Sequence, residues 1–249
     1  MLKIKNLTKS IQDKKIIDNL SLEIDRGKIA VLLGASGVGK STLLRMLNNL
    51  ETADSGTVEL DDTVLDLAKT TQTHTIGIVF QGFNLFEHLT VEQNITLALE
   101  NVAHKNKPES QQIAHQLLKR YGLEDKAKQH VSQLSGEQKQ RLAIARTLSL
   151  KPTIVCLDEP TSALDPLLTT YVAETIKELA HQGYIVLVAT HDTSLLEKMP
   201  CAIHLMHKGA IIESADSNDS FAHKGHYPHI ASFVAGGIAS FVKTHTKMC

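Results

Sequence analysis

The feature that constrains this sequence most is one glycine-rich segment, Gly34-Ala35-Ser36-Gly37-Val38-Gly39-Lys40-Ser41-Thr42. It fits the pattern G-x-x-x-x-G-K-[ST], which is typical of loops that bind nucleotide phosphates. An apolar run at residues 29–33 precedes it and predicts a buried parallel strand. Residues 41–49 follow with apolar side chains at helical spacing. The sequence therefore predicts a strand, a glycine-rich loop and a helix in the order that this pattern requires.

The residue types of this segment, called the phosphate loop below, suit contact with phosphate groups. Its glycines let the backbone bend tightly and approach phosphate oxygens closely. Backbone N–H groups at the start of the following helix point toward the anion, and the helix dipole favours negative charge there. We expect Lys40 to reach the β- and γ-phosphates and the Ser41 hydroxyl to ligate Mg²⁺. The alternative is a glycine-rich turn that binds nothing, which the flanking strand and helix disfavour.

Length and composition exclude several classes of protein. The 249 residues suffice for one large domain or a core with a subdomain. The formal net charge of -1 gives no basic signature, so we expect no nucleic-acid partner. No signal segment is visible, and no apolar run approaches the roughly 20 residues of a bilayer span. Cys156, Cys201 and Cys249 form no C-x-x-C pair, which favours free thiols in a cytoplasmic protein.

Short strands and turns are predicted through the first third of the chain. Polar residues at 12–15 and the Asp-Ser-Gly stretch at 54–56 predict turns. Alternating or apolar patterns predict strands at residues 2–7, 20–24, 57–60, 63–65 and 76–80.

Helical periodicity then takes over, and strands return after it. Residues 85–150 contain helical patterns at 91–99, 109–121 and 136–150, which we interpret as an inserted helical subdomain. Strand patterns at 153–157, 185–189, 201–206 and 210–212, with a helix near 166–181, complete the chain. Apolar strands that alternate with helices predict an α/β fold with a parallel sheet.

Two acidic residues follow one of these apolar strands. Asp158 ends the run 154–157, and ligands bind at the carboxyl ends of strands in such sheets. We expect Asp158 to hold Mg²⁺ through water and Glu159 to polarise the attacking water. The alternative is a solvated loop, which the strand and the upstream phosphate loop disfavour.

A second anion site is indicated at residues 134–138, called the signature segment below. Ser135 with Gln138 three residues later forms a capping box, and a cap alone is the plain alternative. Gly136 is a poor helix former at the first turn, which suggests that the exposed backbone there is needed. A helix N-terminus with a small residue can bind an anion.

Together these motifs resemble the ATP-binding subunits of ATP-binding-cassette (ABC) transporters. The resemblance covers roughly residues 2–213 and rests on motifs in the family's order: the phosphate loop, Gln81, the signature segment, 157–160, 162–165 and 190–192. It implies an α/β fold: a P-loop ATPase core with a parallel sheet, an antiparallel β subdomain and an inserted α-helical subdomain. We expect one ABC ATPase domain over 1–249, with a nucleotide-binding core at 1–84 and 151–249 and a helical subdomain at 85–150.

The resemblance also implies a head-to-tail homodimer and roles for individual residues. Each ATP would lie between one phosphate loop and the other subunit's signature segment, through Ser135, Gly136, Glu137 and Gln138. Asp165 would cross the dimer interface. Gln81 would sense the γ-phosphate and Mg²⁺. His191 would contact the γ-phosphate and hold the water with Glu159.

Within the family, residues 80–90 resemble the polar amino-acid importers, whose pattern is close to F-Q-x-F-N-L-F-P-H-x-T. Phe83, Leu85 and Phe86 would line a groove for integral-membrane permease subunits, although core packing is the alternative for each. A solute-binding protein would act indirectly, and the chain would lie at the cytoplasmic face of the plasma membrane. The alternatives are an exporter, a lipoprotein-release ATPase or a cell-division ATPase.

Three residues depart from the family pattern. Ile11 stands where an aromatic residue usually stacks on adenine, which predicts weak base selectivity. Glu137 replaces the second signature glycine, and its carboxylate would repel a γ-phosphate if it pointed there. Glu87 replaces the proline of the groove motif.

The C-terminal tail carries two weaker patterns. Its histidines could suggest a metal site, but Gly225 and Pro228 break any helical alignment, which favours a solvated loop. Residues 230–242 have a helical apolar stripe that is too short to span a membrane. We expect this stripe to pack on the core or on the other subunit, and a role at the membrane surface is the alternative.

Overall fold

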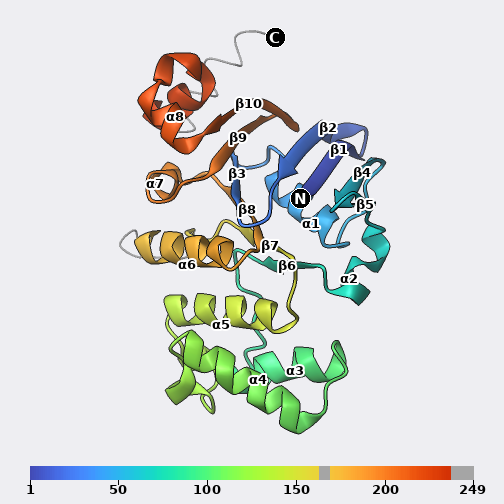
Figure 1. The fold of residues 1–249 in the computed structure, drawn as a ribbon, viewed down its shortest axis with the longest axis vertical. Helices are drawn as coiled ribbons and strands as arrows, with labels where there is room; N and C mark the ends of the chain where they lie inside the picture. The colour runs from blue at the N-terminus through green and yellow to red at the C-terminus, as the bar shows by residue number, and fades with distance from the viewer. Residues whose placement is uncertain (163–168, 237–249) are drawn as a thin grey trace.

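Two β-sheets and a group of helices form the molecule (Figure 1). The computed structural model describes residues 1–162 and 169–236. One sheet has six strands in the order β10-β9-β3-β8-β7-β6, and the other has four in the order β2-β1-β4-β5. This arrangement confirms the predicted fold class, with a largely parallel sheet, an antiparallel sheet and helices. The predicted domain boundaries at residues 84/85 and 150/151 stay a prediction.

The six-stranded sheet places the carboxyl ends of its central strands at one edge. β3 pairs in parallel with β8 and β9, β8 with β7, and β7 with β6, while β10 is antiparallel to β9. Every residue of β3, β7 and β8 is buried, which explains why these segments are apolar without alternation. The strands are β3 (Ile29–Leu33), β6 (Ile76–Val79), β7 (Ile154–Asp158), β8 (Ile185–Thr190), β9 (Ala202–His207) and β10 (Ala210–Asp216).

The four-stranded sheet is antiparallel, and its turns differ from those predicted. It consists of β1 (Leu2–Ile11), β2 (Lys14–Ile24), β4 (Ser55–Leu60) and β5 (Thr63–Val64). Only Gln12 and Asp13, with φ of 48° and 62°, make the first turn, because Lys14 and Lys15 already pair with β1. The predicted turn at 54–56 is wrong, since Ser55 and Gly56 begin β4; a Cβ at Gly56 would lie 2.6 Å from the Asn6 carbonyl oxygen.

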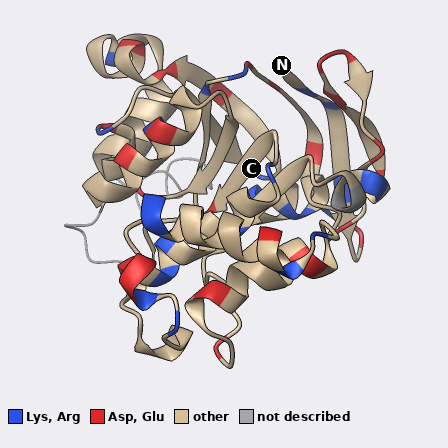
Figure 2. Cartoon of the chain, turned by 60° about the horizontal axis from the view of Figure 1, so that its bottom comes forward, with Lys and Arg blue, Asp and Glu red and all other residues tan. Residues whose placement is uncertain are grey.

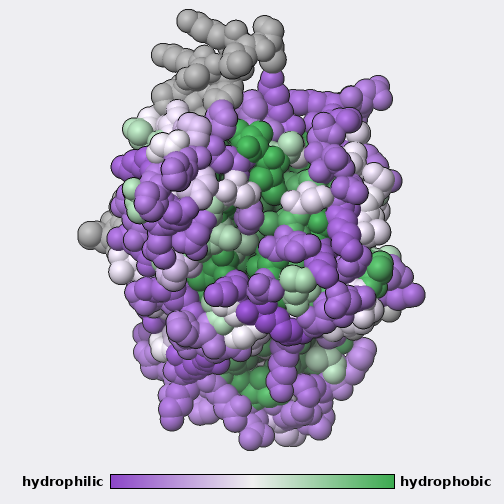
Figure 3. Space-filling view, turned by 45° about the horizontal axis from the view of Figure 1, so that its top comes forward, coloured by the Kyte–Doolittle hydropathy of each residue, from purple (hydrophilic) through white to green (hydrophobic). Residues whose placement is uncertain are grey.

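Apolar layers cover both faces of the larger sheet. Ala30 and Leu32 of β3 face α1 (Lys40–Leu47) and the four-stranded sheet, whereas Val31 and Leu33 face the other helices. Hydrophobic side chains lie in a hollow between hydrophilic rims on the face that Figure 3 draws. Further α-helices are α2 (Thr70–Thr73), α3 (Val91–Asn101), α4 (Lys107–Arg120), α5 (Gly136–Ser149), α6 (Thr169–His181), α7 (Thr193–Leu196) and α8 (Ser217–Ala222).

The helices α3, α4 and α5 pack on one another, and α5 also packs on β6. They lie at the opposite end of the molecule from α8 (Figure 1). Lys, Arg, Asp and Glu are interspersed on their exposed surface rather than gathered by sign (Figure 2). Among the helices that the structure describes, none combines the length and the apolar character that a membrane span needs.

The C-terminal stripe packs on the core as far as the structure describes it. Residues 228–236 are helical, and Ile230 and Phe233 are fully buried in the main core. The Ile230 N–H donates to the Glu213 carboxylate at 2.6 Å, which fixes the start of this helix. The rest of the stripe, at 238–242, lies outside the described residues. Within the described part, no three His, Cys, Asp or Glu side chains gather as a metal site would require.

Candidate active site

The phosphate loop connects the end of β3 to α1 and packs closely against the backbones of β9 and β2. A Cβ at Gly34 would lie 2.7 Å from the Met206 carbonyl oxygen, and one at Gly39 would lie 2.5 Å from the Ile16 carbonyl oxygen. Gly39 also has a φ of 109°, in the left-handed region. These two glycines are therefore required by close backbone approach. Ser36 and Gly37 at the tip of the loop are exposed, and Ala35, Val38, Ser41 and Thr42 are half-buried.

Lys40 is the buried charge at the centre of this loop, with a side chain only 4% exposed. Its ammonium group donates hydrogen bonds to the carbonyl oxygens of Gly34 at 2.7 Å and Ala35 at 3.1 Å. Its nitrogen also lies 3.3 Å from the Glu159 carboxylate. Burial lowers the pKa of Lys40, and the negative charge of Glu159 opposes that shift.

Ser41 and Asp158 form the second part of the site. The Ser41 hydroxyl donates to the Asp158 carboxylate at 2.8 Å. Asp158 is buried at the end of β7; burial raises its pKa, and the Ser41 hydrogen bond opposes this. A hydroxyl oxygen beside a carboxylate oxygen is a donor pair that suits a hard cation such as Mg²⁺. The described residues therefore fit the predicted metal role.

Glu159 links three parts of the site. Its backbone has a φ of 47°, uncommon for a residue with a side chain, and its N–H donates to the Ala189 carbonyl oxygen at 2.8 Å. One carboxylate oxygen faces Lys40, and the other lies 2.9 Å from His191 Nδ1 and accepts from the His191 N–H at 3.3 Å. Glu159 is 11% exposed and His191 44% exposed, so solvent reaches the pair from the His191 side.

Gln81 lies at the same edge of the sheet. It follows β6, which pairs with β7 so that Val79 lies opposite Leu157, the residue before Asp158. Gln81 is exposed in a turn. Asp165, predicted to cross a dimer interface, lies outside the described residues. The structure thus brings the phosphate loop, Asp158, Glu159 and His191 into contact, with Gln81 at the same edge.

The signature segment is not part of this contact. Ser135 caps α5: its hydroxyl accepts from the Gln138 N–H at 3.3 Å, and the Gln138 side chain accepts from the Ser135 N–H at 3.0 Å. Ser135 and Gly136 are exposed. No hydrogen bond or ion pair within residues 1–162 and 169–236 joins the segment to the phosphate loop of the same chain.

Both acidic departures from the family pattern are paired with cations of α5. Glu137 forms an ion pair with Arg141 one turn along the helix. The Glu87 carboxylate lies 3.7 Å from Lys139. Neither partner was identified from the sequence, although the i, i+4 spacing of Glu137 and Arg141 is a recognisable signal.

Two further polar residues of α5 were missed. Gln140 is 1% exposed and donates to the Pro160 carbonyl oxygen at 2.9 Å, which ties α5 to the turn that follows Glu159. Arg146 donates to the carbonyl oxygens of Phe83 at 2.9 Å and Asn84 at 2.7 Å. The sequence feature that could have identified both residues is a polar side chain on the buried face of a predicted helix.

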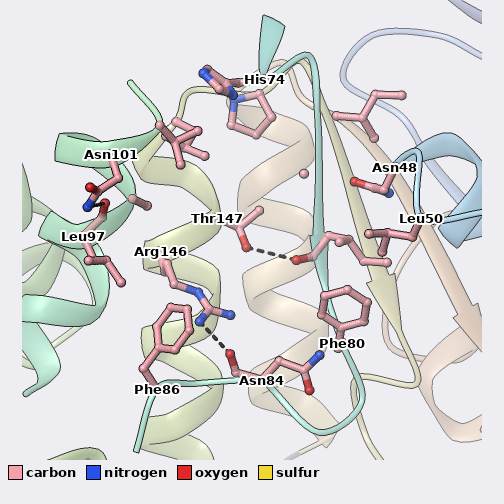
Figure 4. Close-up of a pocket in the computed structure, with 17 residues that line it drawn as sticks. Asn48, Leu50, His74, Phe80, Asn84, Phe86, Leu97, Asn101, Arg146 and Thr147 are labelled. Carbon is pink, nitrogen blue, oxygen red and sulfur yellow. Dashed lines mark hydrogen bonds between the residues drawn. The ribbon is translucent and has the colours of Figure 1, made fainter. Parts of the chain in front are cut away.

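The predicted groove residues divide between core and surface. Phe83 is 9% exposed in the main core, which agrees with the alternative of core packing, and Leu85 is half-buried against that core. That these residues line a permease groove stays a prediction. Phe83 is turned inward by two consecutive left-handed residues, Phe83 and Asn84, with φ of 60° and 47°. Phe86 is 42% exposed and lines a pocket of about 680 Å³ with Leu50, Leu97 and Val102 (Figure 4). Arg146 lies over the Phe86 ring at 5.6 Å.

Known sequences resemble this chain over most of its length. The profile of the family described as ABC transporter matches residues 17–162. The glutamate transport ATP-binding protein GluA of Corynebacterium efficiens is 40% identical over 89% of this chain and 93% of its own length. The probable amino-acid import ATP-binding protein YxeO of Bacillus subtilis is 39% identical over 90% of this chain and 92% of its own length.

The fold of this chain also resembles solved structures of ATP-binding cassettes. A dimeric ATP-binding cassette, MJ0796, in a post-hydrolysis state with ADP and Pi, superposes with a TM-score of 0.76. It is 33% identical and covers 87% of this chain and 99% of its own.

We expect weak discrimination between nucleotide bases, because Ile11 at the end of β1 is aliphatic and 45% exposed. GTP and ATP should bind within about tenfold of each other, which titration of both nucleotides measures. Ile11→Tyr should tighten the binding of both nucleotides, since stacking of a base on an aromatic ring contributes about 1–3 kcal/mol and depends little on which base it is. A strong ATP preference in the unmodified chain would mean that another group stacks on the base.

Proposed function

This chain belongs to the ABC transporter family, and we propose that it is the ATP-binding and ATP-hydrolysing subunit of an importer for polar amino acids. The observation that carries the proposal is the buried contact of Lys40 with Glu159, with His191 on the other carboxylate oxygen. The printed names of GluA and YxeO, glutamate transport and probable amino-acid import, support the substrate class. They favour import over the alternatives of export, lipoprotein release or cell division.

The phosphate loop is proposed to bind the phosphates of ATP. Its exposed tip at Ser36 and Gly37 offers backbone N–H groups to an anion, and Lys40 beneath them supplies the positive charge. Lys40 would then exchange its hydrogen bonds to the loop carbonyls for phosphate oxygens. Ser41, Asp158 and Gln81 would hold Mg²⁺. When bound, the cation neutralises charge that develops on the phosphate oxygens.

Glu159 and His191 are proposed to handle the proton of the attacking water. Once Lys40 turns to phosphate, one Glu159 oxygen is free to accept a hydrogen bond from water. His191 Nδ1 stays on the other oxygen, so the carboxylate remains oriented. Because His191 is 44% exposed, its Nε2 edge can reach a bound γ-phosphate.

We propose that two copies complete two sites head to tail. Ser135, Gly136, Gln138 and the backbone N–H of Glu137 would contact ATP on the partner's phosphate loop, and Asp165 would cross the interface. The exposed backbone of Ser135 and Gly136, separate from the phosphate loop of their own chain, supports this. The dimeric state of the related cassette MJ0796 supports it as well.

The pocket beside Phe86 is the proposed seat of the permease subunits. It combines exposed apolar side chains with the polar side chains of Asn84, Asn101 and Arg146 (Figure 4). Arg146 joins its wall to the segment after Gln81, so a change at the nucleotide can reach a helix seated there. We propose that the chain lies at the cytoplasmic face of the plasma membrane, peripheral through the permease, with a solute-binding protein as an indirect partner.

Glu159→Gln should retain ATP binding and stop hydrolysis, because an amide cannot accept the proton of the attacking water. General-base assistance contributes roughly 10²–10⁴-fold, and the ATPase rate should fall by that factor. ATP should then accumulate in a stable dimer, measured by phosphate release and light scattering. Hydrolysis at a near-normal rate would contradict the role of Glu159.

Leu97→Asp should uncouple ATP hydrolysis from transport, because it places a charge in the apolar pocket. Leu97 is 37% exposed, so the substitution should leave the fold intact. Basal ATPase activity of the purified chain should persist, while stimulation by the reconstituted permease and solute uptake should be lost. Val64→Asp is the matched control, since Val64 is 61% exposed on β5 and outside this pocket. Normal uptake with Leu97→Asp would show that the permease binds elsewhere.

A further inference from the structure

Glu137 occupies a position where a carboxylate would oppose phosphate binding. It is the second residue of α5, directly after the exposed Gly136. Backbone N–H groups in the first turn of a helix have no acceptor within the helix, and the dipole attracts negative charge to them. An unpaired carboxylate tethered at this point would compete with a phosphate for these groups or repel it.

The structure shows what the Glu137 carboxylate does instead. It pairs with Arg141, one turn further along α5 and away from the N-terminus. Both side chains are half-buried, 26% and 22% exposed, so the pair is less screened than a surface ion pair. The carboxylate is thereby neutralised and displaced from the helix end.

Arg141 is itself held by two neighbouring elements. Its guanidinium donates to the Tyr121 carbonyl oxygen at the end of α4, at 3.3 Å. Its Cζ lies 5.2 Å from the centre of the Tyr171 ring of α6. These contacts fix the guanidinium in one place, so it can hold Glu137 in a defined orientation. The nearby cations Lys139 and Arg120 pair with other acids, Glu87 and Glu178.

We propose that Arg141 is a positioning residue that holds the Glu137 carboxylate clear of the nucleotide bound by the partner's phosphate loop. The Glu137–Arg141 pair thereby keeps the signature segment able to accept a γ-phosphate although a carboxylate stands in it. This inference rests on the proposed function, because it requires ATP to lie between the two copies.

The test measures ATP-driven dimerisation in a Glu159→Gln background, where hydrolysis does not interfere. Light scattering against ATP concentration gives the half-maximal concentration. Arg141→Met should raise that concentration about tenfold, because the freed carboxylate opposes the phosphate. Adding Glu137→Gln to Arg141→Met should bring the half-maximal ATP concentration back to within about threefold of the parent value, since the unpaired carboxylate is then absent.

Two variants separate this role from a structural one. Arg120→Met is the matched control: Arg120 pairs with Glu178 of α6 at 2.9 Å, so its loss removes a similar contact between α4 and α6 without freeing Glu137. It should leave dimerisation unchanged. Arg141→Lys keeps the charge and should stay within about threefold of the parent, which tests the proposal even if Arg141→Met does not fold.

Three outcomes would overturn the proposal. The first is that Arg141→Met dimerises at the same half-maximal ATP concentration as the parent. The second is that adding Glu137→Gln to Arg141→Met does not lower that concentration. The third is that Arg141→Lys, folded as judged by thermal melting, needs as much ATP as Arg141→Met. A parent that forms no dimer at any ATP concentration would contradict the proposed function itself, before the effect of Arg141 is measured.

Discussion

Lys40 carries a positive charge into a position that is 4% exposed, and the surrounding structure is arranged around that charge. An ammonium group without partners in such a place would cost several kcal/mol. Two carbonyl oxygens of its own loop and the Glu159 carboxylate offset this cost. Glu159 reaches Lys40 because β3 and β7 both run parallel to β8, so that the carboxyl ends of the three strands meet at one edge. The parallel sheet is therefore a condition of the site.

The same charge explains how the site can respond to a ligand. In this structure Glu159 bridges Lys40 and His191, so the lysine and the carboxylate satisfy each other. In the proposed mechanism, a phosphate that binds Lys40 would release one Glu159 oxygen, while His191 would keep the other. Phosphate binding and activation of the carboxylate would then be linked through one ion pair.

Much of this could be predicted from the sequence, because the relevant signals are local. The apolar run 29–33 is β3, and Asp158 ends β7 as its position after an apolar run predicted. What could not be predicted depends on packing between distant segments. Phe83 belongs to a motif that favours a groove, yet two left-handed residues turn it into the core. Gly56 belongs to a predicted turn, but β1 and β4 approach so closely there that only glycine fits.

The helix α5 shows the same distinction. Its capping box was evident from Ser135 and Gln138, whereas the buried Gln140 and its bond to the Pro160 carbonyl depend on how α5 meets the turn that follows Glu159. The acidic departures at Glu87 and Glu137 are unfavourable when considered alone. Paired with Lys139 and Arg141, they become part of the packing around the signature segment.

The most direct test of this account compares binding of ATP and AMP by the chain and by Lys40→Met, using titration calorimetry with Mg²⁺ present. If Lys40 contacts the β- and γ-phosphates, the substitution should weaken ATP binding about a hundredfold and leave AMP binding nearly unchanged. An equal loss for both nucleotides, or no loss for ATP in a variant that melts normally, would contradict the central role of Lys40.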